Sequence, residues 1–548
     1  MNYKKEIFIL ASIVVILIMV RLPGLSLPYH QDEWKNVNSS SDMAKAGTFF
    51  AHPPLMQMVF VASYNLLGSD YMRVLPLLFF IASIPVLYLV MRDRFDAKTA
   101  RWSVFLFVVC FYSVLGSLSP DVDGAILPFL FLLSVYMYDK KRLWLLLPIL
   151  LAGLLIKLSF ILVVGAIVLD YLIGNWKNFN TKKIALFGLS LLGFAVIYAG
   201  LICLIKFAYP AFDLNLMFGH ANQFAEGLGR NWIQIIVQAI KAIFYLSPLL
   251  LAPLLFINGE IVKKTRVFVV YLLLGLVFYF VLFDFSRGAL DKYLMFAVVP
   301  LAIIVGSIFG TLFQNKKLKT PIIIGIIISV ALLLINFLPH SIVPLYPKEE
   351  WFGRVLTFKW NILNPFHGGS GPMGFYVSFL FIILSFLSSF VFSVLALFKK
   401  EWRASVGAIL LMIGFTYNAI FSEELLFGKI NGNAPKLLEE ASSFIENLPQ
   451  IKKIITYNDI GAYNLSKMGK YAGRIYATPE SEEGYRKKFE EYIKTPGNYF
   501  LVVDMPQINP ESFYGKFFAS CQPVFESQSG KIEAKVYTCG RNGGKSPN

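Results

Sequence analysis

Asp32 and Glu33 are the first residues of the chain whose type and position indicate chemistry. They stand side by side in PYHQDEWKNV (28–37), directly after the first apolar run. A carboxylate beside a second carboxylate can act as a general base whose neighbour orients it or holds a cation. The same pair can instead cap the helix that DEWKNVNSSSDMAKAG predicts, because acidic side chains are favourable at a helix N-terminus. The residues alone leave both interpretations open.

Two further signals follow in the same polar segment. In FFAHPPLMQMV, two prolines come after His52, favour an extended His52 and allow a helix to begin at Pro54. In DYMRVLPLLFFIA, Arg73 stands where a long apolar run begins. A guanidinium there either reaches lipid head groups or clamps a phosphate through two hydrogen bonds. Neither role of Arg73 is decided by its position alone.

Long apolar runs separate these residues from the rest of the chain. Of the 548 residues, 56% are hydrophobic and 15% are charged, whereas soluble domains carry about 25% charged residues. The runs 7–20, 184–205, 321–338 and 373–397 reach or approach the roughly 20 residues that cross a bilayer. Lipid offers no partner to unpaired backbone groups, so such spans must be helical. The composition predicts a polytopic α-helical membrane protein.

The basic residues fall in short loops between the apolar runs. The formal net charge is +16, and the positive-inside rule assigns loops rich in Lys and Arg to the cytoplasm. The basic start, MNYKKEIFIL, is followed by no small-residue cleavage site, so we expect an uncleaved first span with a cytoplasmic N-terminus. Topology explains the charge, and nucleic acid is not expected as a partner. The loops assigned to the cytoplasm are 92–101, 139–142, 175–183, 258–266, 314–319 and 399–403.

This assignment predicts about thirteen spans in the cell membrane. An odd number places the C-terminal part on the external or periplasmic side. We expect a transmembrane domain over 1–421, with a first external loop at 23–72, and a separate external domain over 422–548. The predicted spans are 7–22, 73–91, 102–118, 123–138, 143–157, 158–174, 184–206, 232–257, 267–283, 292–313, 321–338, 373–397 and 404–421.

The polar tail from residue 422 has the pattern of a small α/β domain. Helical stretches such as NAPKLLEEASSFIENL alternate with apolar, strand-like stretches such as NYFLVVDM. Two of the four cysteines, Cys521 and Cys539, lie in this tail. An oxidising external compartment would favour a disulfide between them. Two unpaired thiols are the alternative.

The order of three motifs resembles the membrane glycosyltransferases of the GT-C superfamily. These motifs are the Asp-Glu pair after the first span, His-Pro-Pro-Leu at 52–55 and Met-Arg-x-x-Pro at 72–76. Within the superfamily they are most similar to the protein O-mannosyltransferase and aminoarabinose transferase-like branch. Many spans, a large first external loop and an external C-terminal domain extend the likeness over most of the chain.

The resemblance implies a role for each candidate residue. Asp121 and Asp123, in SLSPDVDGAILPFLFL, match an external loop of the family, with Asp123 the better fit by spacing; a helix cap is their alternative role. Lys157 interrupts AGLLIKLSFILVV, where a lone ammonium is costly without a partner. For the basic residues and the tyrosine, interfacial anchoring is the alternative. The implied roles are Asp32 and Glu33 in catalysis, Arg73, Lys157, Arg287, Lys292 and Tyr293 in donor phosphate binding, and His52, Asp123 and Asp121 in acceptor or sugar binding.

The resemblance also implies the partners. The donor would be a sugar carried on a polyprenyl phosphate, and the acceptor would be an unidentified hydroxyl on the external face. Ala51 replaces an acidic residue that relatives often carry beside His-Pro-Pro, so a metal site is doubtful there. No cofactor is required, and a divalent metal is left open. Without a β-trefoil insert, a protein acceptor is not assumed.

Two rival functions fit the composition. A transporter or lipid-linked sugar flippase would also have many spans, but such proteins usually place ionisable residues near the bilayer midplane. Here the candidate residues gather on one predicted face. A membrane scaffold whose external domain binds a partner would leave the carboxylates without a catalytic role. Loss of sugar transfer on Asp32→Asn would separate the enzyme from both rivals.

Overall fold

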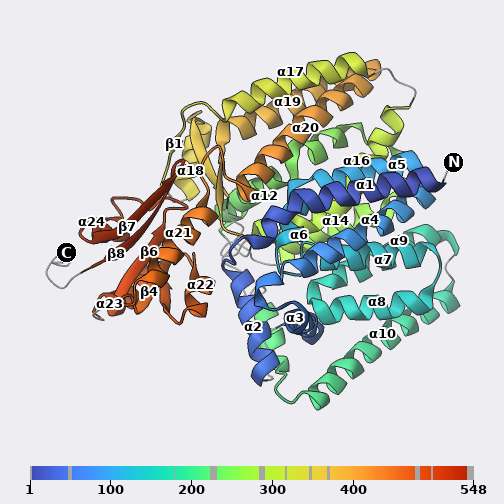
Figure 1. The fold of residues 1–548 in the computed structure, drawn as a ribbon. Coiled ribbons are helices and arrows are strands. Elements are labelled where there is room, and N and C mark those ends of the chain that lie inside the picture. The colour runs from blue at the N-terminus through green and yellow to red at the C-terminus, as the bar shows by residue number, and fades with distance from the viewer. Residues whose placement is uncertain are drawn as a thin grey trace.

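A computed structural model shows a bundle of α-helices with a small α/β domain at one end (Figure 1). The chain begins at the opposite end of the bundle, and its last strands lie in the α/β domain. The predicted fold class, a polytopic α-helical membrane protein with a small C-terminal α/β domain, is confirmed. The structure describes residues 3–46, 52–178, 180–222, 231–282, 290–314, 318–344, 348–366, 371–475, 482–494 and 498–539.

Helices coincide with all the predicted spans. Among the described residues, eight helices are long and apolar enough to cross a membrane, or nine if the bent pair α5–α6 is one span. Other apolar helices are shorter, so the count of thirteen stays a prediction. The helices at the predicted spans are α1 (Tyr3–Arg21), α4 (Val74–Arg94), α5 (Ala97–Val109) with α6 (Phe111–Leu118), α7 (Ile126–Asp139), α8 (Leu143–Ile156), α9 (Ile161–Asn175), α10 (Thr181–Ala208), α12 (Trp232–Leu251), α14 (Arg266–Val277), α16 (Val298–Leu312), α17 (Lys319–Ile335), α19 (Phe379–Phe398) and α20 (Arg403–Leu426).

Helix α16 lies at the centre of the bundle. Every residue from Val298 to Gly310 is buried, as expected of an apolar helix that is surrounded by other helices. Its glycines allow close packing on α5, because a Cβ atom added to Gly306 would lie 2.2 Å from Ser103 Oγ. The apolar residues of this helix therefore contact other helices of the bundle on every side.

Three of the loops assigned to the cytoplasm, 92–101, 139–142 and 258–266, lie together at one end of the bundle. Arg94 at the end of α4 pairs with Asp139 at 2.6 Å and donates to the Lys264 carbonyl at 2.8 Å. Asp93 pairs with Lys140 at 2.9 Å. Figure 1 places the N-terminus at this end and the α/β domain at the other. This arrangement agrees with the predicted topology, although the orientation in a membrane stays a prediction.

The other end of the bundle carries the longer connections. In the first of them, α2 has Asp32 and Glu33 in its first turn, and α3 begins at Pro54, where the fixed φ of proline suits a helix start. Near the α/β domain, β1 pairs in parallel with β2, and β2 pairs antiparallel with β3. The connecting elements are η1 (Leu22–Ser26), α2 (Asp32–Ala46), α3 (Pro54–Leu67), η2 (Ser69–Tyr71), η3 (Leu158–Phe160), η4 (Trp176–Asn178), α11 (Leu214–Asn222), η5 (Ala252–Phe256), α13 (Gly259–Lys264), η6 (Phe278–Leu282), α15 (Leu290–Tyr293), η7 (Leu294–Ala297), β1 (Ser341–Ile342), α18 (Lys348–Leu356), β2 (Ile362–Phe366), β3 (Phe375–Ser378) and η8 (Lys400–Trp402).

The C-terminal domain is built on a sheet with strand order β5-β4-β6-β8-β7. β4 runs parallel to β5 and β6, and β8 runs antiparallel to β6 and β7. Apolar residues of α21 pack on one face of the sheet, including Leu437, Leu438 and Ile445. The elements are α21 (Ala434–Asn447), β4 (Lys453–Tyr457), α22 (Ala462–Lys467), β5 (Tyr471–Ile475), α23 (Glu482–Lys494), β6 (Asn498–Val503), α24 (Phe513–Ala519), β7 (Gln522–Ser529) and β8 (Ile532–Thr538).

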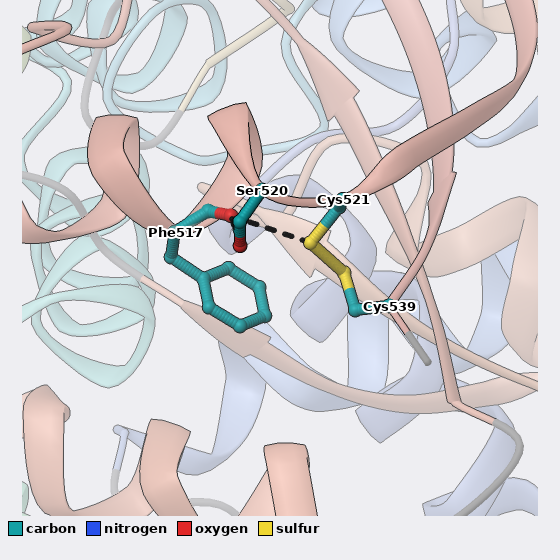
Figure 2. The surroundings of a disulfide bond; sticks show 4 residues. All are labelled: Phe517, Ser520, Cys521 and Cys539. Carbon is teal, nitrogen blue, oxygen red and sulfur yellow. Dashed lines mark hydrogen bonds between the residues drawn. A yellow bond between two sulfur atoms is a disulfide. The ribbon is translucent and has the colours of Figure 1, made fainter. Parts of the chain in front are cut away.

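Cys521 and Cys539 form a disulfide in this domain (Figure 2). Cys521 directly precedes β7 and Cys539 directly follows β8, with 4.7 Å between their Cα atoms. The Sγ atom of Cys521 lies 3.4 Å from the Phe517 carbonyl oxygen at the end of α24. The bond therefore joins the open ends of the β7–β8 hairpin. The remaining cysteines, Cys110 and Cys203, are free thiols in the helical part.

Candidate active site

Arg73 and Glu33 form a buried ion pair in the connection between α1 and α4. Both side chains are fully buried, and the guanidinium meets the two carboxylate oxygens at 2.6 and 2.8 Å. Arg73 also donates to the carbonyls of Leu27, Pro28 and Leu118, at 3.2, 3.1 and 2.5 Å. A guanidinium has five N–H donors, and these contacts use all five. Arg73 thus has no donor left for a ligand in this conformation.

The environment of Glu33 reflects two opposing influences. Burial raises the pKa of Glu33 to about 7, while the charge and hydrogen bonds of Arg73 lower the pKa. The backbone N–H of His30 donates to the same carboxylate at 3.2 Å. A desolvated carboxylate needs such partners, because an unpaired buried charge is strongly unfavourable. Through these hydrogen bonds the ion pair holds the backbone that leads into α2.

Asp32 is the sequence neighbour of Glu33 but faces the surface. Its side chain is 40% exposed and accepts a hydrogen bond from Lys35, one helical turn away, at 3.0 Å. Lys292 lies 3.8 Å from the other carboxylate oxygen. The carboxylate is therefore accessible, and two ammonium groups approach it.

The loop before α7 brings two more carboxylates to this region. Asp121 forms an ion pair with Lys292, and Asp123 pairs with Lys157 at 2.5 Å. Burial raises the pKa of Asp121, but Lys292 and Lys157 outweigh it and lower the pKa to about 2. Asp121 is thus ionised at any physiological pH. Each aspartate of the loop holds one lysine from a distant segment.

Two glycines let this loop approach the helix that precedes it. A Cβ atom added to Gly124 would lie 2.2 Å from the Cα of Gly116 in α6, a separation that no side chain allows. On its other side the loop contacts α2, because Asn36 donates to the Pro120 carbonyl at 3.0 Å. Together these contacts set the distance between Asp32 and the carboxylates of the loop.

Tyr293 lies between the two lysines. The Nζ atom of Lys157 is 4.7 Å from the centre of its ring, and that of Lys292 is 5.8 Å away. Both distances are within the range of cation–π attraction. The ring therefore keeps the two ammonium groups near each other, although each is paired with a different aspartate.

Two hollows open on either side of Asp123. The first encloses about 370 Å³, open solvent included, and is bounded by Asp121, Asp123 and Lys292 on one side and by Tyr112 and Tyr245 on the other. The second encloses about 430 Å³ on the same basis. It is mostly apolar and is lined by Asp123, Leu127, Pro128, Phe131, Ser159, Phe160, Leu162, Tyr271, Tyr279, Tyr293, Phe296 and Val299. Both hollows are mostly apolar, and Asp123 lines both of them.

The structure brings together most of the residues that the sequence singled out. Asp32, Asp121, Asp123, Lys157, Lys292 and Tyr293 form one cluster, and Glu33 and Arg73 form a separate pair behind it. His52 lies in the bend before α3. Arg287 lies outside the described residues. The predicted roles of these residues stay predictions.

Sequence reasoning missed three residues of this region. Lys35 follows the acidic pair at one helical turn, so the spacing of charges in α2 could have identified it. Tyr112 and Tyr245 come from apolar spans, where aromatic residues usually pack in the core; their rings stack 5.0 Å apart. Nothing in the sequence distinguishes these two tyrosines from the other aromatic residues of the spans. Across the described chain, no three His, Cys, Asp or Glu side chains are grouped to hold a metal ion.

Comparisons with known proteins give a family and a fold to which the chain is similar. Residues 51–202 match the family model described as dolichyl-phosphate-mannose-protein mannosyltransferase. The fold is similar to that of ArnT from Cupriavidus metallidurans in the apo state, with a TM-score of 0.54, 14% identity and coverage of 96% of this chain and 97% of that chain. The same protein bound to undecaprenyl phosphate gives a TM-score of 0.52 with 14% identity and the same coverage. No curated protein sequence matches the chain.

These matches extend over different parts of the chain. The family model covers the second part of the first external loop and the helices up to α10, which include Arg73, Asp121, Asp123 and Lys157. The match to ArnT covers nearly the whole length of both chains. The resemblance to the GT-C glycosyltransferases is confirmed by the family model and by the shared fold.

Proposed function

We propose that the chain is an integral-membrane glycosyltransferase that moves a sugar from a polyprenyl-phosphate donor to an acceptor hydroxyl on the external face. The observation that carries this proposal is the cluster of Asp32, Asp121, Asp123, Lys157 and Lys292 around Tyr293. It combines an accessible carboxylate with two ammonium groups beside an apolar hollow. The family model and the fold support the same reaction class.

Lys157 and Lys292 would bind the donor phosphate. Both are held by aspartates in the structure, and an entering phosphate would exchange for those carboxylates as the partner of the ammonium groups. In the reaction the phosphate gains negative charge as it leaves, so cations already in place stabilise the transition state. The structure of ArnT bound to undecaprenyl phosphate supports a lipid phosphate as the ligand. Tyr293 would keep the two lysines close to each other.

Asp32 would act as the general base. Its carboxylate takes the proton of the acceptor hydroxyl, and the acceptor oxygen forms a bond to the anomeric carbon of the sugar. The bond between that carbon and the phosphate oxygen breaks, and polyprenyl phosphate leaves with the electron pair. One displacement inverts the configuration at the anomeric carbon. The exposure of Asp32 supports this role, since an acceptor can reach it from outside the bundle.

Glu33 and Arg73 would position Asp32 without touching substrate. Their bidentate pair and the carbonyls on Arg73 hold the backbone that leads into α2. Arg73 was predicted from sequence to bind the phosphate, but its five N–H groups are occupied, so we assign it to the support of the loop. The hollow beside Tyr293 would hold the first units of the polyprenyl chain, and the hollow by Tyr112, which Asp121 and Lys292 border, would hold the sugar.

Mass analysis of a deletion strain tests the proposal without knowledge of the sugar or the acceptor. Loss of the gene should remove a sugar from an envelope glycan, glycolipid or glycoprotein, and the wild-type gene should restore it. Asp32→Asn should fail to restore it while the protein accumulates to the wild-type level. Asp42→Asn, which changes a carboxylate farther along α2, is the matched control and should restore the sugar. Restoration by Asp32→Asn would overturn the assignment of the base.

A further inference from the structure

The C-terminal domain contacts the first external loop next to the buried Arg73–Glu33 pair. Asp70, in η2, accepts a hydrogen bond from the Tyr463 hydroxyl at 2.9 Å. Lys467 approaches both oxygens of the same carboxylate, at 2.8 and 3.0 Å. Tyr463 and Lys467 lie one turn apart on α22, so one face of this short helix meets η2. Figure 1 shows α22 on the side of its domain that faces α2.

Tyr29 connects this interface to the ion pair. Its ring meets the ring of Tyr463 edge-on, with 4.9 Å between centroids and an interplanar angle of 88°. On the other side, the Arg73 guanidinium lies 4.8 Å from the centre of the Tyr29 ring. The Met72 N–H donates to the Tyr29 hydroxyl at 3.1 Å. The contacts therefore run without a break from Tyr463 through Tyr29 and Arg73 to Glu33.

A second set of contacts reaches α2 from the end of β4 and from β5. The ring of Tyr471 lies 6.0 Å from that of Trp34. The backbone of Asp459 hydrogen-bonds the His30 side chain. Asn458 and Asp459 have φ values of 52° and 63°, a strained conformation that persists only where the surroundings fix it. Residues on both sides of Asp32 and Glu33 are thus held by the C-terminal domain.

We propose that the C-terminal domain positions the catalytic carboxylate, with Tyr463 as the positioning residue. The inference rests on the proposed function, since it assigns the domain a part in that reaction. Tyr463 is 6% exposed, so its ring is fixed between the domain and Tyr29. The Asp70–Lys467 pair is about half exposed and contributes less, because solvent screens such pairs. Asp32 itself stays open to an acceptor.

Substitutions at Tyr463 test this role. Tyr463→Ala removes the ring from Tyr29 and should lower sugar transfer in the complemented deletion strain by about tenfold or more, since a shift of ~1 Å at a reacting group costs about 100-fold. Tyr463→Phe keeps the ring, loses one partly buried hydrogen bond to the half-exposed Asp70 and should stay within about threefold of wild type. Binding of undecaprenyl phosphate to the purified full-length protein should be unchanged in both variants, because the lysine cluster is not altered.

A charge exchange tests the polar part of the interface. Asp70→Lys opposes Lys467 and should lower transfer, while Asp70→Lys combined with Lys467→Asp should restore it. Lys516→Ala is the control, because Lys516 forms a similarly exposed pair with Glu511 elsewhere in the domain. A purely local destabilisation of η2 would not be rescued by the second substitution, so failure of the rescue would contradict the interface.

Amide hydrogen exchange on the same full-length proteins separates the two proposals. Tyr463→Ala should expose the amides of residues 27–35 to exchange and leave those of β4 and β6 protected, which shows that the domain is still folded. Unchanged exchange over 27–35, or wild-type transfer despite faster exchange, would overturn the positioning role. Absence of any sugar change between deletion strain and wild type would instead overturn the proposed function, and the exchange result would then decide the interface alone.

Discussion

Asp32 and Glu33 are neighbours in the sequence, yet they lie in two different ionic environments. Glu33 is completely buried and shares two short hydrogen bonds with Arg73, whose donors are all occupied. Asp32 is 40% exposed and is approached by two lysines, at 3.0 and 3.8 Å. The first environment is closed and rigid. The second is open to solvent.

The difference shows how one helix start can serve two purposes. The first turn of α2 directs one carboxylate into the protein and the next toward the surface, because adjacent residues on a helix point in different directions. The buried pair holds the backbone, and the exposed carboxylate stays accessible. Ion pairs of the same charge type thus support structure in one place and, under the proposed function, would exchange with a ligand in the other.

The largest effect is expected from Arg73→Ala. Removing one member of a buried ion pair leaves the other charge uncompensated and costs about 3–5 kcal/mol. The free energy of unfolding, or the thermal midpoint in detergent, should fall accordingly. Arg92→Ala, at the other end of α4, removes a partly exposed arginine and should cost less than about 1 kcal/mol. Equal stability of the two variants would contradict the structural role of Arg73.

The next largest effect concerns the open cluster. Lys157→Ala and Lys292→Ala each remove a cation that would meet the donor phosphate, and a hydrogen bond to a charged group contributes about 1.5–3 kcal/mol, or about 10- to 100-fold in affinity. Binding of undecaprenyl phosphate to the purified protein measures this. Lys140→Ala, in a pair with Asp93 on the opposite face, is the matched control. Unchanged affinity in both cluster variants would place the phosphate elsewhere.

A smaller effect is expected from pH on the stability of the segment around His30, which contacts the C-terminal domain beside the Arg73–Glu33 pair. Burial lowers the pKa of His30 to about 4. The positive charges of Lys35 and Arg474 also lower this pKa, whereas the negative charge of Asp32 raises it. Between about pH 6.5 and 4 the unfolded chain therefore binds more protons at His30, and stability is lost as the pH falls. At His30 alone the loss should be on the order of 1–2 kcal/mol at pH 5. The raised pKa of Glu33 opposes this loss, because the folded chain binds a proton more readily at that carboxylate.

Amide exchange over residues 27–35 measures this dependence. His30→Gln cannot titrate at this position and keeps Glu33, so the difference between the two proteins isolates His30. After correction for the intrinsic pH dependence, exchange in the wild-type protein should accelerate relative to His30→Gln between pH 7 and pH 5. The same change of exchange with pH in both proteins would show that His30 is not held neutral by its surroundings.

The smallest effect is expected at Lys35. Its pair with Asp32 is more than one third exposed on both sides, and exposed pairs of this kind contribute about 0–1 kcal/mol. Lys35→Ala should leave the free energy of unfolding within about 0.5 kcal/mol of wild type, and sugar transfer should change by less than about threefold. A large loss of stability would mean that the environment of Asp32 is as rigid as that of Glu33.

Much of the fold could be predicted from the sequence, because apolar runs and basic loops report directly on spans and their ends. The break between α5 and α6 at Cys110, a bend of 63°, could not, since no proline or glycine marks it. The candidate residues of the cluster were also identified, from motif order. Their pairing was not, because Lys157 and Lys292 reach Asp123 and Asp121 across the fold.

The separate environments of Asp32 and Glu33 could not be predicted from the sequence either, because they also depend on contacts between distant segments. Which carboxylate is buried depends on the rotation of α2 about its axis, and that rotation is set by contacts with Arg73, forty residues along the chain, and with Pro120. The sequence indicated a base with a helper. The structure adds what each side chain touches.

Amide substitutions at the two neighbouring carboxylates test the account most directly. Asp32→Asn and Glu33→Gln remove one negative charge each with little change of shape, and both are assayed for thermal stability in detergent and for sugar transfer in the deletion strain. We expect Asp32→Asn to retain wild-type stability and to lose transfer. Glu33→Gln should lose stability and should lower transfer per folded protein only in part, because Glu33 positions Asp32 and is not itself the base. Wild-type transfer by Asp32→Asn would contradict the account.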